Sequence, residues 1–212
     1  MKKMEKEIRS FKTNLELRNN DENTSRHICG YAVRFNEPSR YIGWYETIAP
    51  TAITDETLRS SDIFMTFDHH EDNFLARSRF GEGTLNLELR EDGLYFDFEC
   101  PDTAFGNDIM SKVQRGELDE CSFAFSIDPE DNTADTWCRE ADGRTCRTIN
   151  HIARLYDCSI VRTGAYGTTS VSKRAQDKIE QLDAEVLASL QERIDDMNNI
   201  EAQFADVTTE EE

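Results

Sequence analysis

Residues 119–128 read DECSFAFSID, and the stretch has the two-residue period of a β-strand. Because alternate side chains of a strand point to opposite faces, Phe123 and Phe125 share one face, and Ser122 and Ala124 share the other. The aromatic face requires a core, whereas the small, hydroxyl-bearing face leaves room for another molecule to approach. The stretch predicts a core strand in which Ser122 is either a small filler residue or a nucleophile.

Similar patterns recur up to residue 162 and predict further strands. They are EIRSFKTNLELR (7–18), HICGYAVRF (27–35), DIFMTFDHH (62–70), GTLNLELREDGLYFDFEC (83–100) and RTINHIARLYDCSIVR (147–162). The run Glu91-Asp92-Gly93 predicts a hairpin turn within the fourth of them. Short helices are expected in TAITDETLRSS (51–61) and in DTAFGNDIMSKVQRG (102–116), where Gly116 is the stop signal. Runs of strands with few helices favour a barrel or curled sheet in an α+β domain.

The pattern changes after residue 172, where an apolar stripe with helical spacing begins. Its members are Ile179, Leu182, Val186, Leu190, Ile194, Met197 and Phe204, and neither Gly nor Pro interrupts them. Residues 173–212 carry 4 basic and 12 acidic side chains, a net charge of 4 − 12 = −8. We therefore expect a domain over residues 1–172 and an acidic amphipathic helical tail over residues 173–212, joined by a hinge near SVSKRAQ (170–176).

The overall charge narrows the classes of partner. The chain has 24 Lys and Arg against 43 Asp and Glu, a net charge of −19, which repels phosphate backbones and anionic membrane surfaces. No apolar run approaches the roughly 20 residues that span a bilayer, and the N-terminus has no apolar signal-peptide core. The sequence predicts a cytoplasmic protein that binds neither nucleic acid nor membrane.

The six cysteines form no CxxC pair, so the sequence favours reduced, mostly buried thiols over a zinc site. They are Cys29, Cys100, Cys121, Cys138, Cys146 and Cys158. The segment between Cys138 and Cys146 contains READGRT and fits a hairpin turn. No cofactor and no metal are expected.

The motif FDHHEDN (67–73) holds two of the four histidines and has three interpretations. It can be a polar turn after a strand, it can supply His69 as a general base, or its carboxylates and imidazoles can bind a metal. Neighbouring side chains of a strand point to opposite faces, which makes it difficult for His69 and His70 to share one metal ion. The spacing alone leaves the three interpretations open.

Five stretches together resemble the tailed-phage (caudovirus) prohead protease family. In chain order they are GYAVRFNEPS (30–39), ETIAPTAI (46–53), FDHHEDNFLARSRFGEGTLNLELREDGLYFDFECPDT (67–103), RGELDECSFAFSI (115–127) and RTINHIARLYDCSIVRTGAYGTTS (147–170). The resemblance implies a fold like that of the herpesvirus assemblins, a β-barrel ringed by helices, and a serine endopeptidase. Family members cut scaffold segments or the N-terminal part of the capsid protein inside the immature shell.

The resemblance also implies roles for individual residues. The family's histidine before the LAR stretch corresponds to His69, and the serine of its SF-small-F block corresponds to Ser122. The third member corresponds to Asp157, while the second histidine of the herpesvirus relatives makes His151 a rival. Two positions depart from the family: Ala124 stands where glycine is usual, and Gly164 where proline is frequent.

The resulting hypothesis is a serine endopeptidase of prohead maturation, with His69, Ser122 and Asp157 as its catalytic residues. Its expected partners are the phage major capsid protein and scaffold segment, and its expected place is the host cytoplasm inside the assembling prohead. The tail is expected to pack on a partner, which could be a second copy of the chain, and residues 171–176 are a candidate self-cleavage region. The alternatives are a non-catalytic assembly protein with a protease-like domain, a cysteine hydrolase using Cys121, and a metal-dependent hydrolase.

Overall fold

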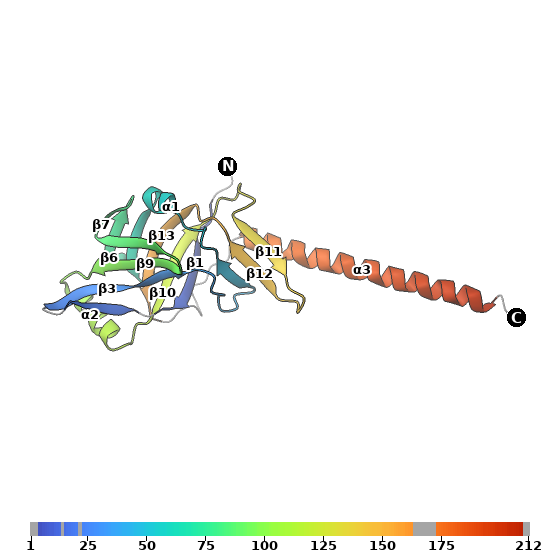
Figure 1. Cartoon of the computed structure of the whole chain (residues 1–212), viewed down its shortest axis with the longest axis horizontal. Helices are drawn as coiled ribbons and strands as arrows, with labels where there is room; N and C mark the ends of the chain where they lie inside the picture. Colours follow the sequence, from blue (N-terminus) through green and yellow to red (C-terminus); the bar gives the residue numbers. More distant parts are fainter. Residues whose placement is uncertain (1–3, 14, 21–22, 163–172, 210–212) are drawn as a thin grey trace. The chain divides into compact units, whose positions relative to one another are not determined.

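The computed structural model describes residues 4–13, 15–20, 23–162 and 173–209 of the chain (Figure 1). The chain divides into two compact units, residues 1–172 and residues 173–212. Among the described residues, the strands and two short helices belong to the first unit, and the second is one long helix.

The largest sheet has six strands and contains most of the stretch DECSFAFSID (119–128). Its order is β1 (Glu7–Lys12), β10 (Glu120–Ser126), β13 (Arg154–Val161), β5 (Asp62–Phe67), β6 (His70–Arg79) and β7 (Glu82–Gly83). Only the β13–β5 pair within it is parallel. The strand with Ser122 is therefore an inner strand, next to the edge strand β1.

Two smaller sheets complete the first unit. A four-stranded antiparallel sheet has the order β2 (Glu16–Asn20), β3 (Asn23–Arg34), β9 (Gly93–Glu99) and β8 (Leu85–Arg90). A three-stranded sheet has the order β11 (Asp135–Arg139), β12 (Thr145–Ile149) and β4 (Tyr45–Ile48). The hairpin expected at Glu91-Asp92-Gly93 joins β8 to β9, and the turn expected between Cys138 and Cys146 joins β11 to β12.

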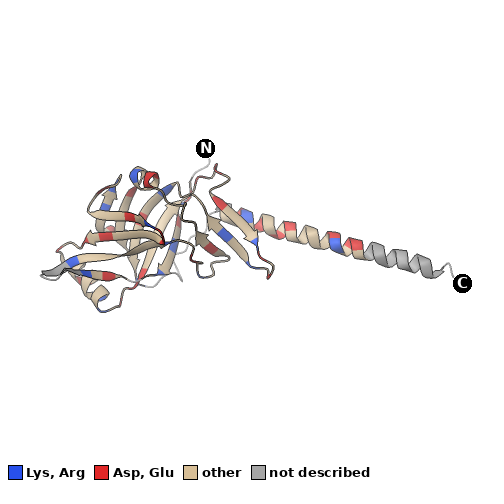
Figure 2. Cartoon of the chain, in the orientation of Figure 1, with Lys and Arg blue, Asp and Glu red and all other residues tan. Residues whose placement is uncertain are grey.

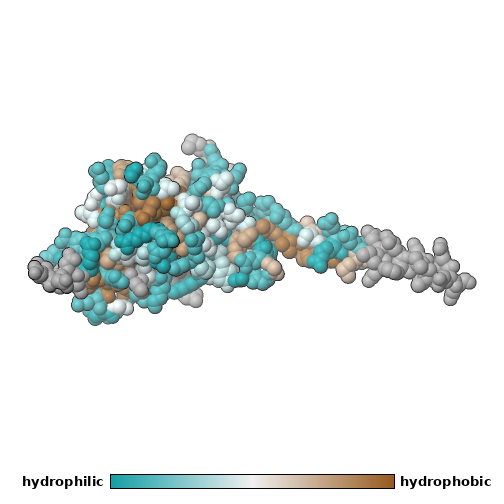
Figure 3. Space-filling model, viewed as in Figure 1, coloured by the Kyte–Doolittle hydropathy of each residue, from teal (hydrophilic) through white to brown (hydrophobic). Residues whose placement is uncertain are grey.

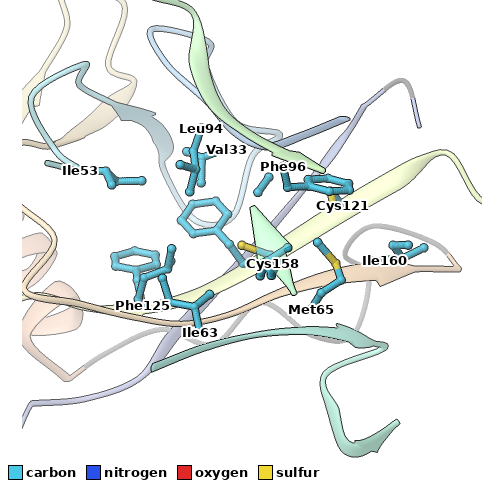
Figure 4. Packing of buried hydrophobic residues seen from close by; sticks show 14 of the residues in the cluster. Val33, Ile53, Ile63, Met65, Leu94, Phe96, Cys121, Phe125, Cys158 and Ile160 are labelled. Atoms are coloured by element: carbon cyan, nitrogen blue, oxygen red, sulfur yellow. The ribbon is translucent and has the colours of Figure 1, made fainter. Parts of the chain in front are cut away.

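The hydrophobic core lies between the six-stranded and four-stranded sheets. In Figure 4, Val33 and Phe96 of the four-stranded sheet face Phe125, Cys158 and Met65 of the six-stranded sheet. All five are at most 2% exposed, so each excludes water almost completely from the space between the sheets. As the alternation predicted, the Phe123–Phe125 face of β10 is the core face, and the two rings stack with centroids 5.3 Å apart.

The fold class was predicted in part. The α+β composition and the C-terminal helix are confirmed. In the part of the chain that the structure describes, however, no sheet closes into a barrel, so the herpesvirus-like barrel is not confirmed. The run EIRSFKTNLELR (7–18) was expected to be one strand, but it divides into β1 and β2, which belong to different sheets.

The two short helices lie within the stretches in which the sequence predicted them. Helix α1 (Asp55–Ser60) has a capping box formed by Thr54 and Thr57. Helix α2 (Ala104–Gln114) begins after Thr103, whose hydroxyl accepts a hydrogen bond from the Gly106 N–H. It ends before Gly116, which has a φ of 68° and takes the left-handed conformation that stops a helix.

The second unit is α3 (Lys173–Thr209), an acidic helix whose described part is shown in Figure 2. Leu187, Leu190, Ile194 and Met197 are large apolar residues that it leaves exposed, and Figure 3 shows apolar surface along it. No helix among the described residues is long and apolar enough to cross a membrane. Of the expected hinge, residues 170–172 lie outside the described residues, and residues 173–176 are the first residues of α3.

A buried cluster of charged side chains ties β1 to the three-stranded sheet. Arg147 of β12 donates to Glu7 (2.7 Å), Glu46 (3.0 Å) and Asp135 (2.9 Å). Arg9 of β1 donates to Glu46 at 2.6 Å and to Glu7 at 2.5 Å. All five side chains are less than a tenth exposed, so two guanidinium groups and three carboxylates neutralise most of each other's charge away from water.

The cluster makes stability depend on pH through Glu7. Burial alone would raise the pKa of Glu7, but hydrogen bonds and charge from Arg147 and Arg9 lower it below its ordinary value of 4.5. The stabilisation that comes from this carboxylate is therefore fully present above pH 4.5 and is lost as the pH falls through the lower folded value.

Replacing Arg147 with Met should destabilise the first unit by about 3–5 kcal/mol, because three buried carboxylates then share one guanidinium. The matched control is Arg144→Met, since Arg144 lies in the β11–β12 turn, is half exposed and pairs with exposed carboxylates. Arg144→Met should lower the free energy of unfolding by no more than about 1 kcal/mol. The measurement is urea-induced unfolding at pH 7, and equal costs for the two variants would contradict the structural role of the cluster.

Candidate active site

Ser122 lies in the middle of β10, with a partner strand on each side. Its partner in β1 is Ser10 and its partner in β13 is Ser159. The side chain of Ser122 points away from the face of Phe123, as the two-residue period requires. Three hydroxyl groups therefore lie side by side across three strands, on the face opposite the core.

His69 is held at the tip of the β5–β6 hairpin by its backbone. Asp68 and His69 form the two-residue loop, with φ values of 52° and 59°. Positive φ at both loop positions is the pattern of a type I′ turn, and Asp and His tolerate it better than most residues. The Asp68 N–H donates to the carbonyl of Ile160 at 3.0 Å, and the His69 N–H donates to the Ser159 hydroxyl at 2.9 Å. These bonds fasten the loop to β13.

The two ring nitrogens of His69 contact two different side chains. Nδ1 lies 2.5 Å from Asp157 Oδ1, and Nε2 lies 2.5 Å from Ser122 Oγ. An ionised carboxylate only accepts hydrogen bonds, so Nδ1 must carry the proton and donate it to Asp157. The neutral ring then has a free lone pair on Nε2, which accepts the Ser122 hydroxyl proton. This is the order of contacts that makes a serine hydroxyl a nucleophile.

The carboxyl of Asp157 is held in its ionised form. Burial by itself would raise its pKa, but the hydrogen bond from His69, the positive charge that His69 has when it is protonated, and Lys6 lower the pKa below its ordinary value. Lys6 Nζ lies 3.0 Å from Asp157 Oδ2, so each carboxylate oxygen has its own partner. Asp157 therefore accepts from His69 without needing a proton of its own at neutral pH.

The expectation that Ser122 lies on an open face was wrong. Ser122 has no exposed surface, and its hydroxyl oxygen has two neighbours besides His69. Ser10 donates to it at 2.9 Å, and the carbonyl oxygen of Arg9 lies 2.9 Å away. Since Ser122 has one hydroxyl proton, that proton is shared between Arg9 and His69 as alternative acceptors. The edge strand β1 thus closes the space that the sequence left open.

The other candidate residues of the sequence analysis lie elsewhere. His151 is more than half exposed, and its Nδ1 lies 3.0 Å from Asp131, so the structure does not bring it to His69. His70 begins β6 with an exposed side chain. Cys121 is on the core face of β10, and burial raises the pKa of its thiol to about 12, so it is not a ready nucleophile.

The six cysteines lie among the described residues as free thiols, and four of them are buried. Within the described ranges no group of three or more His, Cys, Asp or Glu side chains has the arrangement of a metal site. Of the two positions that depart from the family pattern, Ala124 is buried in β10 opposite Asp157, and Gly164 lies outside the described residues.

Three residues that sequence reasoning missed support the arrangement. Ser159 positions the His69 backbone, Ser10 contacts Ser122, and Lys6 contacts Asp157. For Ser159 a signal was present, since it stands two residues after Asp157 on a predicted strand and so shares its face. For Lys6 and Ser10 none was present, because pairing between β1 and β10 spans more than a hundred residues.

The comparisons with known proteins give one match. The model of the family described as caudovirus prohead serine protease matches residues 13–184, a range that includes His69, Ser122 and Asp157 and begins just after β1. No curated protein and no solved structure matches the chain. The match covers well over half of the 212 residues and agrees with the resemblance drawn from the sequence. The chain belongs to the caudovirus prohead serine protease family.

Proposed function

We propose that the chain is a serine endopeptidase in which Ser122 is the nucleophile, His69 is the general base and Asp157 orients the imidazole. The observation that carries the proposal is the pair of 2.5 Å contacts that His69 makes with Asp157 and Ser122. These residues come from three separate parts of the chain, so local sequence alone does not account for their meeting. Membership of a serine protease family supports the same reaction.

The reaction follows the proton positions in the site. Ser122 Oγ attacks the carbonyl carbon of a peptide bond while its proton passes to His69 Nε2. The imidazolium, held through Nδ1 by Asp157, gives that proton to the leaving amine as the carbon–nitrogen bond breaks. Water then attacks the acyl ester on Ser122, again with His69 as base, and the serine is regenerated. A peptide reaches Ser122 only when a group that covers the hydroxyl, such as Ser10, moves aside.

The substrate we propose is a phage shell protein inside the assembling prohead in the host cytoplasm. Its cleaved part is the scaffold or the N-terminal segment of the major capsid protein. Family membership supports a role in prohead maturation. The direct test is co-expression of the chain with the capsid protein and scaffold of its phage, followed by mass spectrometry of new protein termini. New termini with wild type and none with Ser122→Ala are expected.

Ser122→Ala should abolish both peptide cleavage and covalent labelling by a fluorophosphonate, because Ser122 is the hydroxyl that His69 Nε2 contacts and can deprotonate. Cys121→Ser should retain both, since the thiol is buried on the opposite face. The labelled residue is identified by mass spectrometry of the peptides. A metal chelator should leave the rate of peptide cleavage unchanged. A chain that binds capsid protein but is neither labelled nor active would instead be the non-catalytic assembly protein.

Asp157→Asn should lower the labelling rate on the order of 10³-fold or more, because an amide cannot hold the imidazole in the required tautomer and charge state. The control is His151→Ala, which should remain within about twofold, since His151 is exposed and bonded to Asp131. Thermal unfolding of both variants checks that the fold is kept. The reverse order of effects would favour a Ser-His-His arrangement.

For α3 we propose a targeting role: its apolar stripe binds a basic surface of a shell protein and brings the peptidase into the prohead. Exposed Leu187, Leu190, Ile194 and Met197 support this, because an amphipathic helix gains most of its stability from packing its apolar face. The acidic charge of the tail favours a basic partner surface.

A chain ending at Ser172 should keep its fluorophosphonate labelling but enter proheads several-fold less, as measured by quantifying the peptidase in purified proheads. The matched control keeps the whole tail and replaces Leu187 and Ile194 with Ser, which removes two of the four exposed apolar side chains but keeps the helix. Both variants should be depleted. Normal incorporation of the truncated chain would contradict the targeting role, and an insoluble truncated chain would indicate that the helix stabilises the first unit.

A further inference from the structure

The second carboxylate oxygen of Asp157 has a partner outside the three proposed catalytic residues. Lys6 Nζ lies 3.0 Å from Oδ2, while Oδ1 faces His69. The Asp157 side chain is 8% exposed and that of Lys6 is 41% exposed, so the ammonium reaches from the surface to a buried carboxylate. Lys6 Nζ also lies 5.5 Å from the centre of the Tyr156 ring, within the range of a cation–π interaction.

Lys6 is brought to this place by the alternation of β1. Glu7 and Arg9 point into the buried ion cluster, which anchors the strand to the three-stranded sheet. The residues between and before them point to the other face, where Ser10 contacts Ser122 and Lys6 contacts Asp157. The part of the chain that matches the family begins at residue 13, so Lys6 lies before it.

We propose that Lys6 is a positioning residue for the proposed peptidase. Its ammonium group holds Asp157 so that Oδ1 meets His69, and the same ammonium group lets the imidazole remain a neutral base at a lower pH than it would without Lys6. This inference rests on the proposed function. The carboxylate has two equivalent oxygens and can rotate about its last bond. A cation fixed on Oδ2 removes that freedom. The positive charge of Lys6 also disfavours a positive charge on the His69 ring. Asp157 without Lys6 would favour that protonated ring.

The other charged groups around His69 are paired with one another. Asp68, the neighbour in the turn, accepts from the Arg162 backbone N–H at 3.1 Å and from its side chain at 2.6 Å. Glu120, on the Ser122 face of β10, has one carboxylate oxygen 3.5 Å from Arg40, and its other oxygen is buried without a hydrogen-bond partner among the described residues. On β6, His70, Glu71 and Asp72 are exposed to solvent, which screens their charge. Lys6 and Asp157 are therefore the pair whose balance acts most directly on the ring.

The first test measures how fast a fluorophosphonate labels Ser122 at different pH values. In this reaction Ser122 Oγ bonds to phosphorus, the phosphorus–fluorine bond breaks, fluoride leaves and the serine proton passes to His69. The rate therefore rises with pH as the imidazole loses its proton. The full-length variants are Lys6→Met, which keeps the aliphatic part but not the charge, and Lys6→Arg, which keeps the charge. Lys12→Met is the matched control, since Lys12 lies at the other end of β1 from Lys6, is 68% exposed and pairs with Asp119.

Lys6→Met should move the midpoint of the rate profile to higher pH by roughly half to one unit and lower the plateau rate several-fold. Lys6→Arg should have a midpoint and a plateau rate close to those of wild type, and Lys12→Met should match wild type in both quantities. A purely structural role would lower the plateau without moving the midpoint. An unmoved midpoint in Lys6→Met, or an equal shift in Lys12→Met, would overturn the proposal.

The second test does not require an active nucleophile. The imidazole Cε1–H signal of His69 is followed by NMR against pH in Ser122→Ala and in the double variant with Lys6→Met, and is assigned by its loss in His69→Gln. The double variant should titrate at higher pH than Ser122→Ala. Identical titrations would refute the role of Lys6 even if wild type is an active peptidase. If the His69 titration shifts but no fluorophosphonate labels the wild-type chain, the proposed function is refuted. The effect of Lys6 on His69 through Asp157 would then still stand.

Discussion

The antiparallel register between β10 and β13 is the constraint on which the site depends. It sets Ser122 opposite Ser159 and Ala124 opposite Asp157, so the hydroxyl, the carboxylate and the anchor for the histidine loop all lie on one face. A slip of one residue would turn Asp157 and Ser159 into the core and bring apolar side chains out of it. The buried Leu155, Cys158 and Ile160 of β13 prevent that slip, because they must remain between the sheets, as Phe123 and Phe125 of β10 must. Core packing thus holds the proposed chemistry in place.

The edge strand β1 connects two polar networks through its alternation. One face enters the buried ion cluster around Arg147, and the other supplies Ser10 and Lys6 to the site. A buried ion cluster is costly to form, and its net contribution to stability is small unless every charge has a partner. What it provides here is a fixed position for a short strand at a sheet edge. The same strand covers Ser122, so the position of β1 governs both the arrangement of the site and access to it.

The strands found from sequence are those with a clear apolar period, and the missed ones lack it. Strand β6 opens with His70-Glu71-Asp72, which are exposed and polar, and β11 has only one buried residue, Asp135. Residues 7–18 change phase, since Ile8 falls on the opposite face from Phe11, Leu15 and Leu17, and the run divides between two sheets. The barrel expected from family resemblance failed for a related reason, since closure depends on how strands pair at long range.

The sequence by itself determined the α+β composition, the two faces of β10, the acidic helical tail and, through five motifs in order, the family. It also named His69, Ser122 and Asp157, because motif residues can be identified one by one. Tertiary structure alone brought those three within hydrogen-bond distance, separated His151 from them, and closed the site with β1. The physical reason is that local periodicity fixes which face a side chain occupies, whereas strand pairing between distant segments fixes what lies next to it.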